Sequence, residues 1–182
     1  MSMNGAKSLL KKQKRASLQS TVPESELQKS LGKKCDRPSR EWCLMETARI
    51  WAKRGTCLRA EVGSVLEKEG RIISLGYVGS SPGKDHCLDK GCLMDKNIKG
   101  CVRGTHSEIN VIGFAARYGI STEGSTLYVT VSPCLGCSQA ILASGIKKVV
   151  YLRKYRDLSG IENLKRNNII VEEFLSKGGE VK

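Results

Sequence analysis

The chain has 182 residues, a formal net charge of +13, eight cysteines and two histidines. Its length suits one domain that buries about two-thirds of its chain surface, and no apolar run reaches the roughly 18 residues that a membrane-spanning helix needs. Because the amino terminus lacks an apolar segment followed by a small-residue cleavage site, we expect no secretory signal and interpret the cysteines as reduced thiols, metal ligands or small core residues.

Residues 1–38 are expected to form a basic, disordered tail, because their apolar content is too low for a second core. Residues 1–40 contain ten Lys or Arg against three acids, and no acid precedes Glu24. Such a tail is a solvated segment, a contact for nucleic acid, or a nuclear or organellar address on an otherwise cytoplasmic protein. Residues 39–182 are expected to form the functional domain, and their net positive charge suits an anionic ligand such as a nucleotide phosphate.

From Arg40 onward, the hydrophobic pattern predicts regular structure. The stretch "REWCLMETARIWAKRG" has apolar residues at helical spacing, and this helix should end at Gly55. Its apolar stripe is expected to comprise Trp42, Met45, Ala48, Ile50 and Trp51. The stretch "EVGSVLEKEGRIISLGY" predicts two strands joined by the turn "EKEG". Residues 79–104, rich in Gly, Ser, Lys and Cys, predict a long loop, and such loops are usually functional or stapled by a metal.

The second half of the chain alternates helices with strands. The expected order is a helix over His106–Tyr118, a strand over residues 125–131, a helix over Cys134–Ser144, a strand over residues 147–152, a helix around residues 158–166 and a strand over residues 168–174. Alternation at this spacing is typical of crossover units, so it predicts a mainly parallel sheet between layers of helices.

Two cysteines begin one of these helices. Cys134 and Cys137 follow Pro133, and their spacing puts both sulfurs on one side of the first turn. The helix dipole and the free N–H groups there favour thiolates, the form that binds metal. Taken alone, this CxxC pattern is equally typical of a redox pair or of two packed thiols.

His106 begins another helix, where a lone histidine is most often a capping or core residue. If both helices follow neighbouring parallel strands, their amino termini meet at one edge of the sheet, where α/β proteins build their sites. His106, Cys134 and Cys137 then supply three zinc ligands and leave a fourth position for water, as in catalytic zinc sites. Glu108 is expected to lie beside that water and to move its proton. H-x-E followed by P-C-x-x-C is the signature of zinc deaminases that act on cytosine or adenine.

With these motifs, the chain resembles the deoxycytidylate (dCMP) deaminases of the cytidine deaminase-like superfamily from about Arg40 to Glu173. The resemblance rests on "HSEINVI" and "SPCLGC", together with "CLRAEVGSVLEKEGRIISLGYVGS", "HCLDKGC…CVRGTHSE" and "GIKKVVYLRKYRD" in that family's order. It implies an α/β fold with three α/β/α layers and a central five-stranded mixed sheet. Transfer-RNA adenosine deaminases share the zinc motif but are less similar around the Cys-rich loop.

The resemblance also implies a reaction, the hydrolytic deamination of dCMP to dUMP and ammonia. Zinc held by His106, Cys134 and Cys137 would activate a water that attacks C4 of the cytosine. Glu108 would move the water's protons to N3 and then to the departing amine.

For the substrate, the resemblance implies three contacts. The backbone beside Ser107 would meet the base edge, Tyr155 would stack near the ring, and Arg117 would lie near the phosphate or a subunit boundary. The alternatives are core packing for Tyr155 and a solvated helix face for Arg117. Relatives are usually homo-oligomers, dimers or hexamers, and some bind dCTP as an activator and dTTP as an inhibitor.

Two positions depart from the family pattern. Val78 stands where asparagine is usual, so the amide expected to hydrogen-bond the sugar is missing. Ser107 stands where alanine is usual, and the change is expected to be mild because the backbone recognises the base there. Val78 therefore leaves the choice of substrate open.

The remaining cysteines suggest a second metal site. In some relatives, the positions of Cys57 and Cys87 contribute to a structural zinc, and Cys92, Cys101 or His86 would complete the ligand set in this chain. The alternative is a group of reduced core thiols.

Three functions follow from these motifs. The first is deamination of dCMP. The second keeps the chemistry but moves it to dCTP or single-stranded nucleic acid, as the basic tail and Val78 suggest. The third is a zinc-stabilised binding module without turnover, for which an open fourth metal position would have little use.

Overall fold

The computed structural model describes residues 37–97 and 100–175. The tail expected over residues 1–38 lies outside the described residues up to position 36, so its disorder and its partners stay predictions. Among the described residues, no helix is long and apolar enough to cross a membrane.

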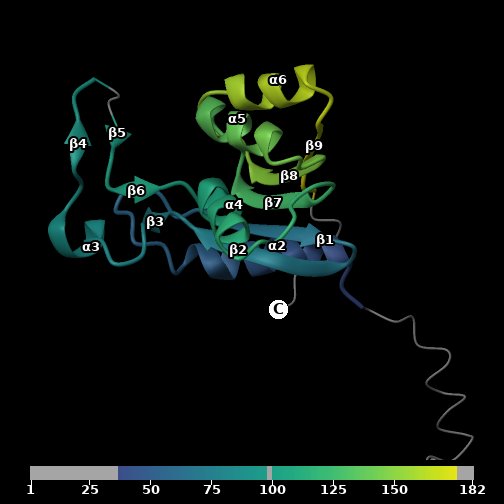
Figure 1. The fold of residues 1–182 in the computed structure, drawn as a ribbon, viewed down its shortest axis with the longest axis horizontal. Coiled ribbons are helices and arrows are strands. Elements are labelled where there is room, and N and C mark those ends of the chain that lie inside the picture. Colours follow the sequence, from purple (N-terminus) through teal and green to yellow (C-terminus); the bar gives the residue numbers. More distant parts are fainter. Residues whose placement is uncertain (1–36, 98–99, 176–182) are drawn as a thin grey trace, which may run out of the picture. The chain divides into compact units, whose positions relative to one another are not determined.

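A five-stranded mixed sheet in the order β2-β1-β7-β8-β9 forms the centre of the domain (Figure 1). The strands are β1 (Gly63–Lys68), β2 (Arg71–Tyr77), β7 (Thr126–Val131), β8 (Lys148–Arg153) and β9 (Ile170–Glu173). β1 pairs antiparallel with both β2 and β7, and the expected hairpin is thereby confirmed. Among the described strands, parallel pairing joins β7 to β8 and β8 to β9, in the crossover half of the chain.

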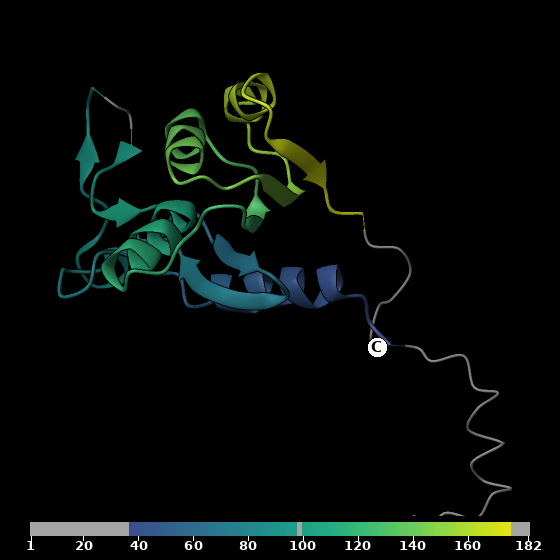
Figure 2. The same ribbon diagram turned by 45° about the vertical axis from the view of Figure 1, so that its right-hand side comes forward.

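Helices cover both faces of this sheet (Figures 1 and 2). They are α2 (Arg40–Ala52), α4 (Ser107–Arg117), α5 (Leu135–Ala143) and α6 (Ser159–Arg166). Consecutive residues of β1 face opposite layers, because Val65 packs in a core cluster with α2 and Leu66 packs in another with α4, α5 and α6. This three-layer α/β/α arrangement around a mixed sheet confirms the expected fold class.

The apolar stripe of α2 differs from the expected one. Its buried residues are Leu44, Met45, Ala48 and Ala52, whereas Ile50 is 63% exposed. Residues 44, 48 and 52 repeat every fourth position and share one face, and position 50 lies on the opposite side of the helix. The prediction that Ile50 belongs to the stripe was wrong.

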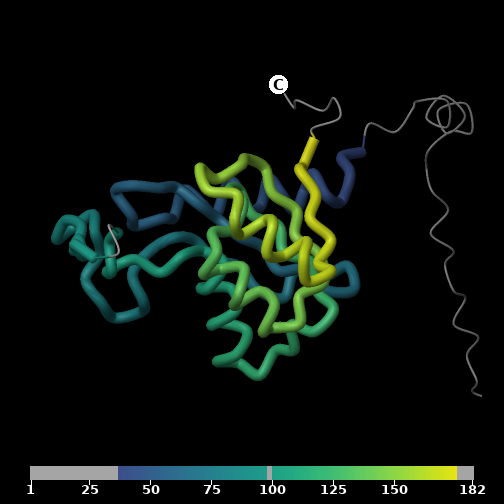
Figure 3. The backbone as a smooth tube through the Cα atoms, turned by 90° about the horizontal axis from the view of Figure 1, so that it is seen from above, coloured from purple at the N-terminus to yellow at the C-terminus, as the bar shows by residue number. Residues whose placement is uncertain are grey.

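The segment between β2 and α4 leaves the sheet and returns to it (Figure 3). Its short elements are β3 (Gly79–Ser80), α3 (Cys87–Lys90), β4 (Met94–Asp95), β5 (Gly100–Cys101) and β6 (Gly104–Thr105), with β3 paired to β6 and β4 to β5. α4 therefore follows β6 and not a strand of the central sheet, which corrects the expectation of two neighbouring parallel strands. Its first turn still reaches the sheet because Gly76 of β2 has no side chain, and a Cβ there would lie 2.8 Å from the carbonyl oxygen of Ser107.

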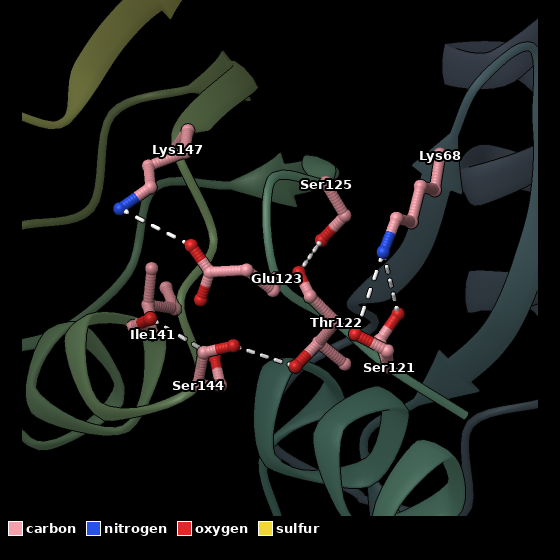
Figure 4. Close-up of polar contacts among 8 residues, drawn as sticks. All are labelled: Lys68, Ser121, Thr122, Glu123, Ser125, Ile141, Ser144 and Lys147. Carbon is pink, nitrogen blue, oxygen red and sulfur yellow. Dashed lines mark hydrogen bonds and ion pairs between the residues drawn. The ribbon is translucent and has the colours of Figure 1, made fainter. Parts of the chain in front are cut away.

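Polar contacts join the connections that follow α4 and α5 (Figure 4). The Thr122 hydroxyl donates to the carbonyl oxygen of Ser144 at 2.6 Å, and Lys147 pairs with Glu123 at 3.5 Å. These contacts lie beyond the carboxyl ends of the two helices. Because these contacts join the segments that follow α4 and α5, they help to keep the two helices, and with them their amino ends, in a fixed relative position.

Candidate active site and metal centre

A cavity of about 520 Å³ lies where the amino ends of α4 and α5 meet the Cys-rich segment. His106 and Glu108 line it from α4, and Cys134 lines it from the start of α5. Tyr155 contributes from the connection between β8 and α6, and Val78 contributes an apolar wall. Residues far apart in the sequence therefore share one pocket.

His106, Cys134 and Cys137 gather at the end of this cavity. His106 is the N-cap of α4, Cys134 is the N-cap of α5, and Cys137 is buried in the first turn of α5. Their ligand atoms all lie within 4.8 Å of one another. The Nδ1 atom of His106 lies 3.3 Å from the Cys137 sulfur and 3.6 Å from the Cys134 sulfur.

These distances fit a tetrahedral zinc ion. Bonds of about 2.3 Å to sulfur and about 2.0 Å to nitrogen place ligand atoms roughly 3.5–3.8 Å apart. Hydrogen bonds from the Cys137 and His106 side chains to its sulfur lower the pKa of Cys134 to about 3, so one thiolate is already favoured. The hydrogen bond that its thiol makes to the Cys134 sulfur, followed by burial, raises the pKa of Cys137. A cation between the two sulfurs would remove that conflict, so the donor set suits zinc.

Glu108 is almost fully buried in the first turn of α4, and burial raises the pKa of its carboxyl group. The Ser107 hydroxyl donates to Oε2 of Glu108 at 3.0 Å, and the Ser64 hydroxyl of β1 donates to Ser107 at 2.6 Å. Both serines are fully buried. The Ser107 side chain therefore contacts the Glu108 carboxylate. The sequence analysis expected serine in place of the usual alanine to have a mild effect, and it did not predict this contact.

Removing both of these serines should cost less than the sum of the costs of removing each one. Ser107→Ala leaves the buried Ser64 hydroxyl without its acceptor, at a cost of about 1–3 kcal/mol, and the double variant has no such unpaired hydroxyl, so it avoids this part of the cost. Urea unfolding of Ser64→Ala, Ser107→Ala and the double variant should therefore give a double-variant loss at least about 1 kcal/mol smaller than the sum of the single losses. Additive losses would contradict a coupled pair.

The other expected substrate residues lie in different places. Tyr155 is half-buried on the cavity wall, and its backbone N–H donates to the Ser132 hydroxyl at 2.8 Å. Arg117 is at the far end of the 11-residue α4, with its guanidinium 5.9 Å from the Tyr118 ring centroid. Since such a helix is about 16 Å long, Arg117 does not line this cavity, and its expected role would need a second copy of the chain.

A second group of thiols forms beside the cavity. The sulfurs of Cys87, Cys92 and Cys101 lie within 4.8 Å of one another, with 3.6 Å between Cys87 and Cys101. Burial and the neighbouring Cys101 raise the pKa of Cys87 to about 12. Burial also disfavours ionisation of Cys101, but backbone N–H groups, first that of Arg103, and the Cys87 thiol lower its pKa to about 7.

The two other residues expected at this second site lie apart from the three thiols. Among the described residues, the structure groups neither Cys57 nor His86 with them. The Cys57 sulfur accepts the backbone N–H of Arg59 at 3.4 Å and lines the main cavity. The Nδ1 atom of His86 lies 3.2 Å from the Thr56 hydroxyl oxygen.

The sequence reasoning missed several residues of the site. Arg59 and Arg156 line the cavity, and Ser64 supports Glu108 through Ser107. The sequence could have indicated Arg156 as a cavity residue, because it directly follows Tyr155, which was expected near the substrate. Arg59 in a polar loop and Ser64 in a strand carried none, since a polar residue in such positions usually faces solvent.

The family model for the cytidine and deoxycytidylate deaminase zinc-binding region matches residues 39–153. The chain belongs to this family. The resemblance inferred from the motifs is thereby confirmed, and in this deaminase the residues of these motifs lie at the starts of α4 and α5.

Relatives of this deaminase include named deoxycytidylate deaminases. It is 35% identical over 161 residues to the deoxycytidylate deaminase of Enterobacteria phage T4, covering 68% of this chain and 83% of that protein. It is 39% identical over 112 residues to ComE operon protein 2 of Bacillus subtilis, covering 62% of this chain but only 58% of that protein. The dCMP deaminase of cyanophage S-TIM5, solved in complex with dCMP and dUMP, superposes with a TM-score of 0.67 at 30% identity, covering 76% of this chain and 98% of that one.

Proposed function

We propose that this deaminase converts dCMP to dUMP and ammonia by zinc-dependent hydrolysis. The observation that carries the proposal is the buried carboxylate of Glu108 in the same cavity as His106 and Cys134. The phage relatives named deoxycytidylate deaminase, one of them solved with dCMP and dUMP, support this choice of substrate. The cavity of about 520 Å³ has room for a nucleotide together with water.

In this proposal, His106, Cys134 and Cys137 hold the catalytic zinc. The thiols and the imidazole have the spacing of zinc ligands, and helix amino termini stabilise the thiolates. A bound zinc ion supplies a Lewis acid with an open fourth position, which lowers the pKa of a water there by several units. Two thiolates and one neutral imidazole balance its charge.

Glu108 moves the protons. Its buried carboxylate takes one proton from the attacking water and delivers it to N3 of the cytosine as the new C4–O bond forms. It then carries the second proton to the amine, which leaves C4 as ammonia, so that water and dCMP give dUMP and ammonia in balance. Burial raises the pKa of Glu108. A carboxyl group with a raised pKa holds a proton more readily, so it can carry the proton from the water to the substrate.

The substrate would be held by the cavity walls. We propose that Tyr155 packs against the cytosine ring and that the backbone at the start of α4, next to Ser107, meets the base edge. Val78 is buried and lines the cavity, so it offers the sugar an apolar contact in place of an amide. Such a pocket would recognise the base through backbone contacts. It would discriminate little between different sugars, because Val78 makes no hydrogen bond to them.

The proposal is tested by ammonia release across dCMP, dCTP, deoxycytidine and single-stranded DNA, with zinc content determined on the same sample. We expect dCMP to have the highest kcat/KM. Turnover of single-stranded DNA alone would support the polynucleotide alternative and would overturn the proposal. Full zinc occupancy without turnover of any cytosine substrate would support a binding module.

We also propose that Cys87, Cys92 and Cys101 hold a second, structural zinc. Cys57, which the structure does not group with these thiols, would have to move toward them to serve as the fourth ligand. The three sulfurs have the required spacing, and Cys57 lines the same cavity as Cys101. A structural zinc site normally has four protein ligands, and its metal stabilises the fold directly.

The second zinc predicts a change in stoichiometry. The protein should contain about two zinc ions per chain, and Cys92→Ser should lower this to about one and reduce the midpoint of thermal unfolding. Cys43→Ser is the matched control, because Cys43 is exposed and outside both thiol groups. Elemental analysis that finds one zinc per chain in the unaltered protein, with no change in Cys92→Ser, would reject the second site.

We further propose that the deaminase is a homo-oligomer, a dimer or hexamer, that responds to dCTP and dTTP. The tilted rings of Phe114 and Tyr118, at the carboxyl end of α4, have their centroids 4.5 Å apart and are 45% and 60% exposed. Apolar surface of this kind often belongs to an interface, and Arg117 lies beside it. Sedimentation velocity with and without dCTP or dTTP tests the assembly, and a monomer under all conditions would contradict it.

A further inference from the structure

A chain of buried polar side chains leads from the central sheet to the carboxylate of Glu108. The Ser64 hydroxyl of β1 donates to the Ser107 hydroxyl at 2.6 Å, and the Ser107 hydroxyl donates to Oε2 of Glu108 at 3.0 Å. Both serines are fully buried, and Glu108 is 4% exposed. The proton transfers proposed above use the carboxylate but assign no task to either hydroxyl.

Ser64 is held in place on both sides. It belongs to an inner strand of the sheet, where it pairs with Gly76 of β2 and with Val129 of β7. The first turn of α4 packs directly against the sheet at Gly76, because an added Cβ there would lie 2.8 Å from the carbonyl oxygen of Ser107. Ser64 is therefore a fixed point from which the sheet contacts the side chain of Ser107.

The direction of the two hydrogen bonds follows from the chemistry of a hydroxyl group, which has a single hydrogen to donate and lone pairs to accept. Since Ser107 gives its hydrogen to Glu108, it accepts the hydrogen of Ser64. The bond from Ser64 thereby sets the rotation of the Ser107 hydroxyl. In a buried site, hydrogen bonds in series also strengthen one another.

A glutamate that transfers protons needs a support of this kind. Its side chain has several rotatable bonds, and burial alone does not decide which oxygen faces the cavity. With Oε2 bound to Ser107, Oε1 is left to exchange protons in the cavity that Glu108 lines together with His106. Proton transfer needs hydrogen-bond distance, and a misplacement of about 1 Å can lower a rate by roughly a hundredfold.

We infer that Ser107, oriented by Ser64, is a positioning residue that holds the Glu108 carboxylate for proton transfer. The inference rests on the proposed function, because it concerns the proton carrier of that reaction. Both hydroxyls act through Glu108, so they change the rate of the chemical step and not the affinity for the nucleotide. Alanine is usual at position 107 in the family, so the loss should be smaller than that of the carboxylate itself.

The test separates kcat from KM for dCMP in single and double variants. Ser107→Ala keeps the backbone that is proposed to meet the base, so it should lower kcat by about tenfold while KM stays within about twofold. Ser64→Ala frees the Ser107 hydroxyl to rotate and should lower kcat by about threefold. The double variant should match Ser107→Ala, because Ser64 acts through Ser107. Zinc content should stay unchanged in all three.

The matched control is Ser74→Ala. Ser74 of β2 is also buried and also joins the sheet to α4, since its hydroxyl donates to the carbonyl oxygen of Val111 at 2.9 Å. This variant loses a buried hydrogen bond between the same layers, but the bond does not involve Glu108. It should unfold at a lower urea concentration and keep kcat within about twofold.

An unchanged kcat in Ser107→Ala, or an equal loss of kcat in Ser74→Ala, would overturn the inference. Losses that multiply in the double variant would overturn the role of Ser64. If Ser107→Ala does not fold, Ser64→Ala decides by the same comparison of kcat with KM.

If the unaltered enzyme deaminates no cytosine substrate, the proposed function fails separately. Crystal structures of the unaltered protein and of Ser107→Ala then decide the positioning role. A displaced Glu108 carboxylate in the variant supports it, and a carboxylate in the same place overturns it.

Discussion

Glu108→Gln is expected to lower dCMP turnover by about a hundredfold to ten-thousandfold while the zinc content stays unchanged, because general acid–base catalysis typically contributes that much. Glutamine keeps the shape of the side chain and can still meet the Ser107 hydroxyl, but it cannot accept and return a proton. The carboxylate does not belong to the His106, Cys134 and Cys137 group, so metal binding should survive. Steady-state kinetics and elemental analysis on the same preparation measure both quantities.

The control for this variant is Glu61→Gln, since Glu61 is an exposed acid that lines a second hollow, together with Arg153 and Lys154, and does not line the active-site cavity. It should retain full turnover. Substantial activity in Glu108→Gln would contradict the assigned proton transfer. Loss of zinc together with activity would instead make Glu108 a structural support of the metal centre.

Gly160→Ala is expected to damage the metal centre from outside the cavity. Gly160 of α6 packs against the backbone that carries Cys134, and an added Cβ would lie 2.1 Å from the carbonyl oxygen of Pro133 and 2.7 Å from the carbonyl carbon of Cys134. Backbone atoms on both sides must therefore shift. Overpacking of this kind costs about 1–3 kcal/mol, and the displaced Cys134 should weaken zinc binding and turnover.

The matched control is Gly136→Ala, which inserts the same methyl group between Cys134 and Cys137 at the start of α5. A Cβ at Gly136 meets nothing within 4 Å. Alanine also favours a helix over glycine by about 1 kcal/mol, so this variant should keep its zinc and its activity and unfold at the same or higher urea concentration. A fully active, zinc-replete Gly160→Ala protein would show that α6 does not position Cys134.

The metal motifs and the second half of the fold could be predicted from the sequence because the determinants are local. Strongly apolar strands alternate with helices there, and the structure places β7, α5 and β8 within about two residues of the expected bounds. His106 and Cys134, the proposed ligands, were expected at helix starts, and they are the N-caps of α4 and α5.

The missed features depend on contacts between distant segments. Ser64 and Ser107 are separated by 43 positions, and no local pattern indicates that their hydroxyls meet. The grouping of Cys87 with Cys92 and Cys101 depends on how an irregular segment folds back through β4 and β5. Spacing in the sequence could not separate these thiols from Cys57.

The central claim is that this chain uses water to replace the amine of dCMP, and one measurement tests it most directly. The zinc-loaded protein is incubated with dCMP in water enriched in heavy oxygen, and the product is examined by mass spectrometry. The account predicts dUMP that carries one heavy oxygen atom at C4, released together with one equivalent of ammonia. Unchanged dCMP, or dUMP without the label, would contradict it.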